Sequence, residues 1–418
     1  MNEDTIIEFP APEESTADYL TQVLRDGAQR LLAQAVEAEA ATFLARFSDL
    51  TTEDGRQRVV RHGRQPERSI QTGLGPVPVK KRRLRDRGGA EGEEPIRFTS
   101  KILPPYLRRS KALNELIPAL YLRGISTGEM MDALAALLGP NAANLSPKAV
   151  RRLIADWRSD MEAWKNRKLD KTYVYIWADG VYLKARMEDD KQCILVLIGV
   201  TSDGDKELIG FEDGYRESTQ SWRELLLDLK KRGLQTPPKL AIGDGALGFW
   251  SALGEVFGST RHQRCWVHKT ANVLNKLPKS LQGKAKDDLK DIWLAETRVD
   301  AEAAFDLFIE KYAVKYAKAA ECLKKDRDEL LTFYDFPAEH WKHLRTANPI
   351  ESTFATVRHR TKRSKNCLSR KTALPMVFKL IMAAQKRWRA IDAKHLLPKI
   401  ETGVIFADGL ETEISSAA

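Results

Sequence analysis

The stretch that decides the fold is Thr172–Arg186, TYVYIWADGVYLKAR. It begins with alternating aromatic and β-branched residues, a pattern typical of a half-buried β-strand. The run then meets Asp179-Gly180 and continues as a second apolar strand. Because Asp is a poor strand former, the pair either makes a hairpin turn or places a carboxylate on the sheet to hold a metal ion.

A second apolar strand, Lys239–Gly243, is also followed by Asp-Gly, at Asp244. A third carboxylate, Glu351, lies at the start of a predicted helix. Three such carboxylates can hold two divalent cations about 4 Å apart, an arrangement suited to phosphodiester cleavage and strand transfer. All-oxygen ligation favours Mg²⁺, with Mn²⁺ possible, over zinc. We therefore predict that Asp179, Asp244 and Glu351 are both the catalytic residues and the metal ligands.

Glu351 has a second interpretation, because it is the fourth residue of Asn348-Pro-Ile-Glu351. Asn at the N-cap, Pro at the first helical position and Glu at the third form a capping box, in which the Glu side chain returns a hydrogen bond to the N-cap backbone. The spacing leaves both the capping and the catalytic interpretation open.

The composition indicates an anionic partner. The chain has 418 residues, enough for two or three domains, and a formal net charge of +10. Residues 56–87 hold 11 basic and 2 acidic side chains, and residues 358–371 hold 7 basic and no acidic ones. Basic clusters in an otherwise balanced chain favour nucleic acid, although each cluster could also be a solvated face.

The four cysteines are scattered and form no Cys-x-x-Cys pair, which favours a reducing compartment. The N-terminus is acidic, unlike a secretory signal, and the longest apolar run, Cys193–Val200, is too short to span a bilayer. We therefore expect a cytoplasmic, nucleoid-associated protein with no membrane partner.

The region upstream of the strands divides into three predicted parts. Residues 1–55 form an acidic segment whose apolar periodicity over 16–47 predicts an amphipathic helix. Residues 56–109 lose this periodicity and gain Gly, Pro and Arg, as in a flexible basic arm that neutralises DNA phosphates; a targeting signal is the alternative. The candidate DNA-binding residues of the arm are Arg61, Arg64, Lys80, Lys81, Arg82 and Arg83.

Residues 110–166 predict three helices, with a turn at 123–127 and a stop at Gly139-Pro140. Two short helices before a helix bearing Lys148, Arg151 and Arg152 suit a helix-turn-helix-like DNA-binding domain. An ordinary helical linker domain fits the same pattern.

From residue 170 the pattern changes to strands. We expect a three-strand antiparallel meander over 172–178, 181–187 and 193–201, followed by helix, strand, helix and strand up to residue 269. This order predicts a ribonuclease-H-like catalytic domain of the α/β class, in which the first and fourth strands present aspartates side by side. Residues 270–345 read as an all-α insertion, 346–395 as the final helices of the domain, and 396–418 as a loosely ordered tail.

Cys265 and His268, in Arg264-Cys-Trp-Val-His-Lys269, raise the question of a zinc site. They supply two ligands where a structural site usually has four, and His262, His340 and His343 would have to be recruited, so we expect no zinc. Downstream of Glu351 the predicted helix is basic and could hold the DNA backbone. Its candidate DNA-binding residues are Arg358, Arg360, Lys362 and Arg363.

Several long motifs in order carry a resemblance to a known family: ADGVY, IGDGALGFW, RCWVHKTANVLNKLPK and FPAEHWKHLRTANPIESTFATVRHRTKRSK. Over nearly its whole length the chain resembles the mutator-type transposases of bacterial insertion sequences. The resemblance implies a DDE transposase with Asp179, Asp244 and Glu351 as metal ligands and with Cys265 and His268 as the family's Cys-x-x-His motif. One departure is His62, where Asn is expected after Arg61; it concerns the arm and leaves the three carboxylates untouched.

The resemblance further implies that the terminal inverted repeats of an insertion sequence are the substrate. The expected partners are double-stranded DNA and further copies of the chain, as a homodimer or higher oligomer on DNA. Two alternatives remain: a transposase-derived regulator that binds DNA without catalysis, and a structure-selective nuclease on the same fold.

Overall fold

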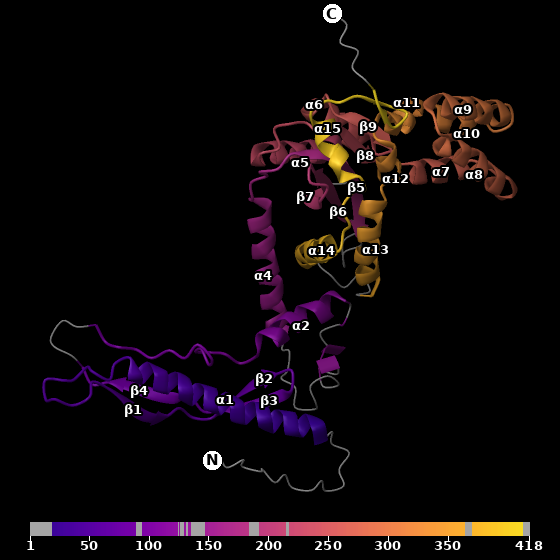
Figure 1. The fold of residues 1–418 in the computed structure, drawn as a ribbon. Coiled ribbons are helices and arrows are strands. Elements are labelled where there is room, and N and C mark those ends of the chain that lie inside the picture. The colour runs from indigo at the N-terminus through magenta and orange to yellow at the C-terminus, as the bar shows by residue number, and fades with distance from the viewer. Residues whose placement is uncertain are drawn as a thin grey trace, which may run out of the picture. The chain divides into compact units, whose positions relative to one another are not determined.

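The computed structural model describes residues 19–88, 94–123, 125, 129–130, 133–134, 147–183, 192–214, 217–363 and 370–412 (Figure 1). The chain divides into two compact units, Met1–Arg151 and Arg152–Ala418, and each is described by itself. None of the helices in the described ranges is long and apolar enough to cross a membrane.

The first unit is built on a long helix, α1 (Tyr19–Ala45), and four short strands. The strands β1 (Val59–Arg64) and β4 (Arg82–Asp86) pair antiparallel, as do β2 (Arg68–Thr72) and β3 (Gly75–Val79). The helix packs on β3 and β4 around a small apolar core. That core contains Val36, Ile70, Val77, Val79 and Leu103.

These strands lie where the sequence analysis expects a flexible arm, and that expectation of flexibility is wrong for residues 59–86. The reason is in Gly75-Pro-Val-Pro-Val79, whose alternate residues Gly75, Val77 and Val79 are buried. A period of two places these positions on one face, which α1 then covers. The abundance of Arg, Gly and Pro concealed a short amphipathic hairpin.

An ion pair closes the β1–β4 ribbon at its buried end. Arg58 Nε lies 3.0 Å from Asp86 Oδ1, and both side chains are only 8% exposed. Asp86 also accepts hydrogen bonds from the backbone N–H groups of Gly88 and Ile96, at 3.0 and 2.7 Å. The hydrogen bond from Arg58 is the main reason why the pKa of Asp86 is lowered, and this one carboxylate connects the end of the ribbon to the segment that follows it.

After the ribbon come α2 (Lys111–Leu122) and α4 (Pro147–Lys165), the first and last of the three helices expected in the helix-turn-helix-like region. The turn expected at 123–127 and the helix end near Leu138 fall largely outside the described residues. The helix-turn-helix-like domain therefore remains a prediction.

The second unit contains a five-stranded mixed sheet in the order β7-β6-β5-β8-β9 (Figure 1). The strands are β5 (Tyr173–Leu183), β6 (Gln192–Thr201), β7 (Lys206–Gly214), β8 (Leu240–Gly243) and β9 (Arg261–Arg264). β5, β6 and β7 pair antiparallel, whereas β8 runs parallel to β5 and β9 parallel to β8. The unit is therefore of the α/β class.

The central strand β5 is longer than expected, and it runs without a turn through Asp179-Gly180. Asp179 pairs with Val196 and Gly180 with Leu195, so the hairpin interpretation of this Asp-Gly pair is wrong. The apolar strand β6 offers a continuous partner, and ladder hydrogen bonds outweigh the weak strand preference of the two residues. The third strand of the meander is β7, at 206–214 instead of 193–201.

The two faces of the sheet are covered by different helices. α5 (Thr219–Arg232) and α6 (Leu247–Val256) pack on one face, where Ile176 and Ala178 belong to the core cluster. On the other face Tyr175 Oη lies 2.9 Å from His340 Nδ1, and Trp177 Nε1 donates to the Thr346 carbonyl at 3.2 Å. Since strand side chains alternate, Asp179 follows Tyr175 and Trp177 onto this second face.

The second face is covered by α13 (Asn348–Arg363) and α14 (Arg370–Gln385). α13 packs against β5 and α14 against β7, where the rings of Phe211 and Phe378 meet at 5.7 Å. The sheet is thus enclosed between two helical layers, with β5 at its centre.

Between β9 and α13 the chain is helical (Figure 1). The longer helices of this helical segment are α7 (Trp266–Leu274), α8 (Lys279–Leu294), α9 (Arg298–Ala313) and α10 (Ala317–Lys324). The short helices α11 (Arg327–Leu331) and α12 (Trp341–Leu344) complete it. The two ends of the helical segment lie side by side, because the backbone N–H of Trp266 donates to the Arg345 carbonyl at 2.9 Å.

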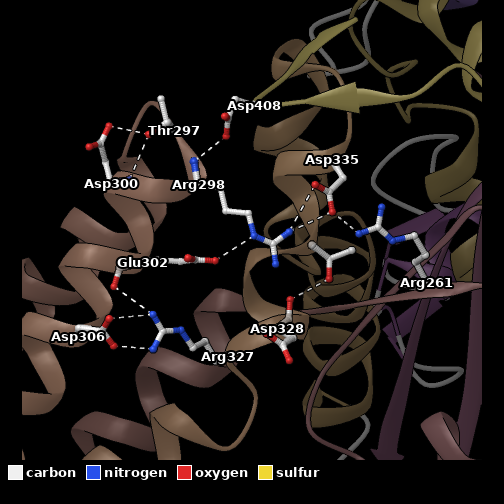
Figure 2. A network of polar contacts seen from close by, with 11 residues as sticks. Arg261, Thr297, Arg298, Asp300, Glu302, Asp306, Arg327, Asp328, Asp335 and Asp408 are labelled. Carbon is white, nitrogen blue, oxygen red and sulfur yellow. Dashed lines mark hydrogen bonds and ion pairs between the residues drawn. The ribbon is translucent and has the colours of Figure 1, made fainter. Parts of the chain in front are cut away.

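Figure 2 shows a polar network that ties the helical segment to the sheet and to the C-terminal residues. Asp335 binds both Arg261 of β9 and Arg298 of α9, the latter at 3.2 Å. The backbone N–H of Arg298 donates to Asp408 Oδ1 at 2.6 Å. One arginine therefore links three parts of the chain that are far apart in sequence.

Asp408 belongs to a small hairpin where the sequence analysis expects a loosely ordered tail. α15 (Leu397–Glu401) precedes β10 (Phe406–Ala407) and β11 (Leu410–Glu411), which pair antiparallel. The turn residues Asp408 and Gly409 have φ angles of 49° and 81°, as a type I′ turn requires. The hairpin signal of Asp-Gly is thus realised here, and not within the sheet at Asp179.

Candidate active site

Asp179 and Asp244 lie at the same edge of adjacent strands. The parallel pairing of β5 and β8 ends at Ala178 opposite Gly243, and each aspartate is the next residue. Asp179 Oδ1 accepts the N–H of Gly180 at 2.8 Å, and Asp244 Oδ1 accepts the N–H of Ala246 at 2.9 Å. The second bond also begins the turn into α6, so Asp244 has a local structural role in addition.

The surroundings of Asp179 disfavour its ionised form. Burial raises the pKa of Asp179 to about 8, and the charges of Asp244, Glu217 and Glu351 add to the effect. A carboxyl group with such surroundings holds a proton at neutral pH unless a cation takes its place. Perturbed carboxylates that converge in this way are typical of functional sites.

Glu351 lies in the first turn of α13, the helix that packs against β5. Its backbone N–H donates to the Ala347 carbonyl at 3.0 Å, and its Oε1 is buried without a hydrogen-bond partner among the described residues. The Asn348 N–H instead meets Thr346 Oγ1 at 3.5 Å. The reciprocal bond of a capping box from Oε1 to the Asn348 backbone is therefore absent from this part of the chain.

Cys265, His268 and Glu351 come together, with one ligand atom of each within 4.8 Å of the others. His268 Nδ1 lies 3.6 Å from Glu351 Oε1, and Nδ1 likewise has no hydrogen-bond partner within the described ranges. Cys265 Sγ accepts the Ala347 N–H at 3.2 Å, and burial raises the pKa of the thiol to about 11. The structure thus brings the Cys-x-x-His motif to the third predicted carboxylate.

The histidines considered as further zinc ligands have other partners. His340 contacts Tyr175, and His343 Nε2 accepts the Asp392 N–H at 3.3 Å. His262 lies 4.7 Å from the Trp250 ring. The cluster at Cys265 therefore offers three ligand atoms within the described chain, and a structural zinc site usually has four.

Two basic residues beside the motif form a buried network that sequence reasoning did not anticipate. Arg264 Nη1 donates to the Asp244 carbonyl at 2.6 Å, and its Nη2 lies 3.2 Å from Asp326 Oδ2. Lys269 binds the same carboxylate of Asp326, and all three residues are less than a tenth exposed. The network fixes the backbone at Asp244 to the helical segment. Asp326 is far from Arg264 and Lys269 in sequence, so sequence reasoning could recognise only the two basic residues that flank the motif.

Glu217 is a further acidic residue that the sequence analysis did not single out. A Cβ placed on Gly180 would lie 2.5 Å from Glu217 Oε1, so the carboxyl group rests directly on the strand after Asp179. Its Oε2 is buried without a hydrogen-bond partner in the described chain, and burial followed by the charge of Asp244 raises its pKa. In the sequence Glu217 precedes Ser218, which caps α5 by accepting a hydrogen bond from the Ser221 N–H. A helix cap is easier to recognise from the sequence than the role of Glu217.

Most of the predicted DNA-binding residues in the first unit have partners within that unit. Glu37 of α1 binds both Arg64 and Arg82, at 3.0 and 2.8 Å, and Lys80 lies 3.1 Å from Glu67. Arg61 and Arg83 are exposed. Lys81 lies over the ring of Phe98, 5.6 Å from its centroid. These contacts neither test nor remove a role in DNA binding.

The remaining predicted DNA-binding residues lie on two helices. Arg152 is exposed on α4, while the side chains of Lys148 and Arg151 are outside the described set. Arg358 is exposed on α13 downstream of Glu351. The helix continues through Arg360, Lys362 and Arg363, whose side chains are also outside the described set.

A half-buried aspartate pair on a mixed sheet, faced by a helix that carries a further carboxylate, defines an acidic type of site on an α/β protein. Comparison with known families shows to which family the chain belongs. The family described as "Transposase, Mutator family" matches residues 5–391, and the chain belongs to that family.

Relatives of the chain are named transposases of insertion sequences. It is 51% identical to the transposase for insertion sequence element IST2 of Acidithiobacillus ferrooxidans, over 68% of this chain and 97% of the relative. It is 50% identical to that for element IS6120 of Mycolicibacterium smegmatis, over 71% and 92%. With the transposase for IS256 in transposon Tn4001 of Staphylococcus aureus it shares 27% identity over 94% and 95%.

Proposed function

We propose that the protein is a DDE transposase that binds the terminal inverted repeats of an insertion sequence and carries out metal-dependent DNA cleavage and strand transfer. The observation that carries the proposal is the placement of Asp179 and Asp244 at one sheet edge, where burial raises the pKa of Asp179 to about 8. The strand order β7-β6-β5-β8-β9 supports a ribonuclease-H-like catalytic domain. Membership of the Mutator family supports the same activity.

The donor atoms at the site fit a hard divalent cation. Asp179, Asp244 and Glu351 are oxygen donors. Burial, followed by the neighbouring negative charges, raises the pKa of Asp179, and a bound cation would favour its ionised form. Within Glu351, the Oε1 atom is buried and has no hydrogen-bond partner among the described residues, which leaves it available to bind a cation. Bound Mg²⁺ or Mn²⁺ would supply an activated nucleophile and stabilise the leaving oxygen.

The chain's own residues would hold the substrate and the acidic side chains in place. Arg264 fixes the backbone of Asp244, so the second aspartate keeps its position beside Asp179. Arg358 and the following basic residues of α13 would bind backbone phosphates next to Glu351, which orders a strand without reading its sequence. Sequence reading would fall to the first unit and α4, where Arg152 is exposed.

The proposed partners are double-stranded DNA and further copies of the chain on that DNA. The relatives' names state that they act for insertion sequence elements, and the substrate proposed here is the pair of ends of such an element. Two ends must be brought together for transfer, which supports a homodimer or a higher oligomer.

The test uses the full chain and labelled duplexes that carry candidate element ends. With Mg²⁺ we expect nicking at the end and, with target DNA present, a joined product; chelation should abolish both. A protein that binds the ends but never cleaves them would be a regulator. A protein that cleaves without joining, and without regard to the end sequence, would be a nuclease. Either outcome overturns the proposal.

A further inference from the structure

A cavity of about 510 Å³ lies between α7, α8 and the end of α12 in the helical segment. This volume is within the roughly 300–1,000 Å³ of small-molecule sites. Two tryptophans, Trp266 and Trp293, contribute to its apolar wall, and none of the described residues that line it is acidic. We call it the tryptophan pocket. The cations around it are Lys286, Lys290, Lys342 and Arg345.

Contacts with the helical segment hold both indole rings in place. Trp266 is buried, and its Nε1 donates to the Leu330 carbonyl at 2.9 Å. The guanidinium of Arg345 lies 5.3 Å from the centroid of the half-buried Trp293 ring and also donates to the Trp293 carbonyl. Both rings are therefore immobilised before a ligand binds, so a flat ligand that stacks on them loses little affinity to the ordering of these side chains.

The charge around the pocket favours an anionic ligand. Lys286 is exposed, and it forms no ion pair with a carboxylate of the described residues. Lys290 pairs with Asp287 at 2.9 Å and Lys342 pairs with Asp392, but both pairs are well exposed. Exposed pairs contribute little, so a phosphate can compete for these lysines. The pocket thus combines a flat apolar wall with a cationic rim.

The tryptophan pocket shares two backbone segments with the carboxylate site. Val267, on its wall, directly precedes His268, whose ring faces Glu351. Thr346, also on its wall, accepts a hydrogen bond from Trp177 of β5 two residues before Asp179. A strand held at the carboxylates would therefore pass close to the rim.

We propose that the tryptophan pocket binds one nucleotide base that is unstacked from a DNA strand held at the carboxylate site. This inference rests on the proposed function, because it assumes that DNA reaches those carboxylates. Bases stack on aromatic side chains without regard to sequence, and lysines and arginines hold the flanking phosphates. Moving a base out of the stack opens the backbone beside it to chemistry.

The test compares two labelled single strands of equal length and equal charge. One is an oligothymidylate, and in the other every base is replaced by an abasic site. The full chain carries Asp179→Asn so that nothing is cleaved, and affinity is measured by fluorescence anisotropy at fixed salt. We expect the oligothymidylate to bind at least about fivefold more tightly than the abasic strand, as one stacked base contributes.

The variants assign this preference to the pocket. Trp293→Ala should reduce the ratio of the two affinities to near one while leaving the abasic strand bound as before. Trp293→Phe keeps an aromatic ring and should retain most of the ratio. Lys284→Ala, an exposed lysine of the same helix outside the pocket, should leave the ratio unchanged. If Trp293→Ala does not fold, Trp293→Leu replaces it, since leucine keeps apolar volume without a ring.

Two results overturn the proposal: equal affinity of the unmodified chain for both strands, or a base preference that survives the loss of the Trp293 ring. The second would place stacking elsewhere on the chain. Because no cleavage is measured, the result is independent of the activity test. A Trp293-dependent preference in a chain that never cleaves element ends would leave the pocket standing while the transposase proposal fails.

Discussion

The two sides of the candidate active site are built in different ways. The sheet side consists of Asp179 and Asp244, which the hydrogen-bonded pairing of β5 and β8 holds at one edge. The helix side consists of Cys265, His268 and Glu351, which meet through contacts between segments far apart in sequence. One such contact is the hydrogen bond from the Ala347 N–H to Cys265 Sγ, at 3.2 Å.

This difference indicates where each side can be perturbed. A strand ladder repeats its hydrogen bonds along the whole pair, so a side-chain change on the sheet side leaves the backbone in place. On the helix side, individual side chains determine where Glu351 stands. Substitutions of Asp179 and Asp244 should therefore leave the pairing of β5 and β8 in place, whereas substitutions that break a contact on the helix side should also move Glu351.

The largest effect is expected from Asp179→Asn and Asp244→Asn. Each should reduce cleavage of element ends about a thousandfold or more, because a neutral amide cannot replace a carboxylate that holds a dication. DNA binding should persist, and the Asp179→Asn protein should melt at a higher temperature than the unmodified protein in chelator, since the cost of burying this titratable carboxyl group beside other acidic groups is removed. Single-turnover cleavage and thermal melting measure the two effects.

Asp203→Asn is the matched control, because Asp203 is exposed in the turn between β6 and β7. It should change neither activity nor melting. Undiminished Mg²⁺-dependent cleavage by either active-site variant would remove that aspartate from the site.

The next effect concerns Glu351→Gln, which separates catalysis from a structural role. Glutamine has nearly the same size and shape as glutamate, and the lost charge costs at most about 1 kcal/mol of helix stability. We expect a protein that melts near the unmodified temperature and binds element ends, yet cleaves about a hundredfold more slowly or worse. Normal cleavage by the folded variant would leave Glu351 with a structural role only.

A smaller effect is expected at Gly180, where the sheet side meets Glu217. Gly180→Ala places a Cβ within 2.5 Å of the Glu217 carboxyl, which must move and shift the strand beside Asp179. Cleavage should fall about tenfold as the aspartate loses its alignment. The double variant Gly180→Ala, Glu217→Ala should recover most of the rate, because the obstructing carboxyl group is gone. If the double variant stays as slow as the single one, crowding by Glu217 is not the cause.

The smallest effect is a pH dependence of stability on the helix side. Burial lowers the pKa of His343 to about 4, and its Nε2 accepts the Asp392 N–H, so the folded protein keeps the ring neutral. The unfolded chain takes up a proton near pH 6.5, so stability should fall as the pH drops from about 6.5 towards 4. His343→Gln removes this titration and should weaken the fall by roughly 1–2 kcal/mol.

The measurement is denaturant unfolding at a series of pH values. His359→Gln serves as the control, since His359 is exposed on α13. A pH profile for His343→Gln that parallels the unmodified protein would show that His343 titrates alike in both states.

The sheet side could be predicted from the sequence because it depends on local signals. Alternation in β5 and the apolar run of β8 identify two strands, and on each an aspartate follows the last residue that pairs β5 with β8. The error at Asp179-Gly180 arose because the same dipeptide also makes hairpins, as at Asp408-Gly409. Only the partner strand β6 decides between the two outcomes, and pairing partners cannot be read from a single segment.

The helix side was predictable only in part. The sequence marks Cys265, His268 and Glu351 as separate candidates, but their meeting depends on how the intervening helices return the chain to β9. Glu217 and Asp326 were missed for the same reason, since their importance lies in contacts with residues far away in sequence. The strands at 59–86 were missed because a basic composition masked a period of two that only α1 completes.

The hydrogen bond between Trp266 and Arg345 has a consequence for how the family can diversify. The two ends of the helical segment meet beside the sheet, so a change in the length of the segment need not move the strands. Doubling such an excursion adds only about 0.6 kcal/mol of closure entropy. Helices outside the Arg264–Asp326–Lys269 network can therefore be gained, lost or exchanged here while the carboxylates keep their places, and this part of the segment is a natural position at which to graft a foreign domain onto the protein.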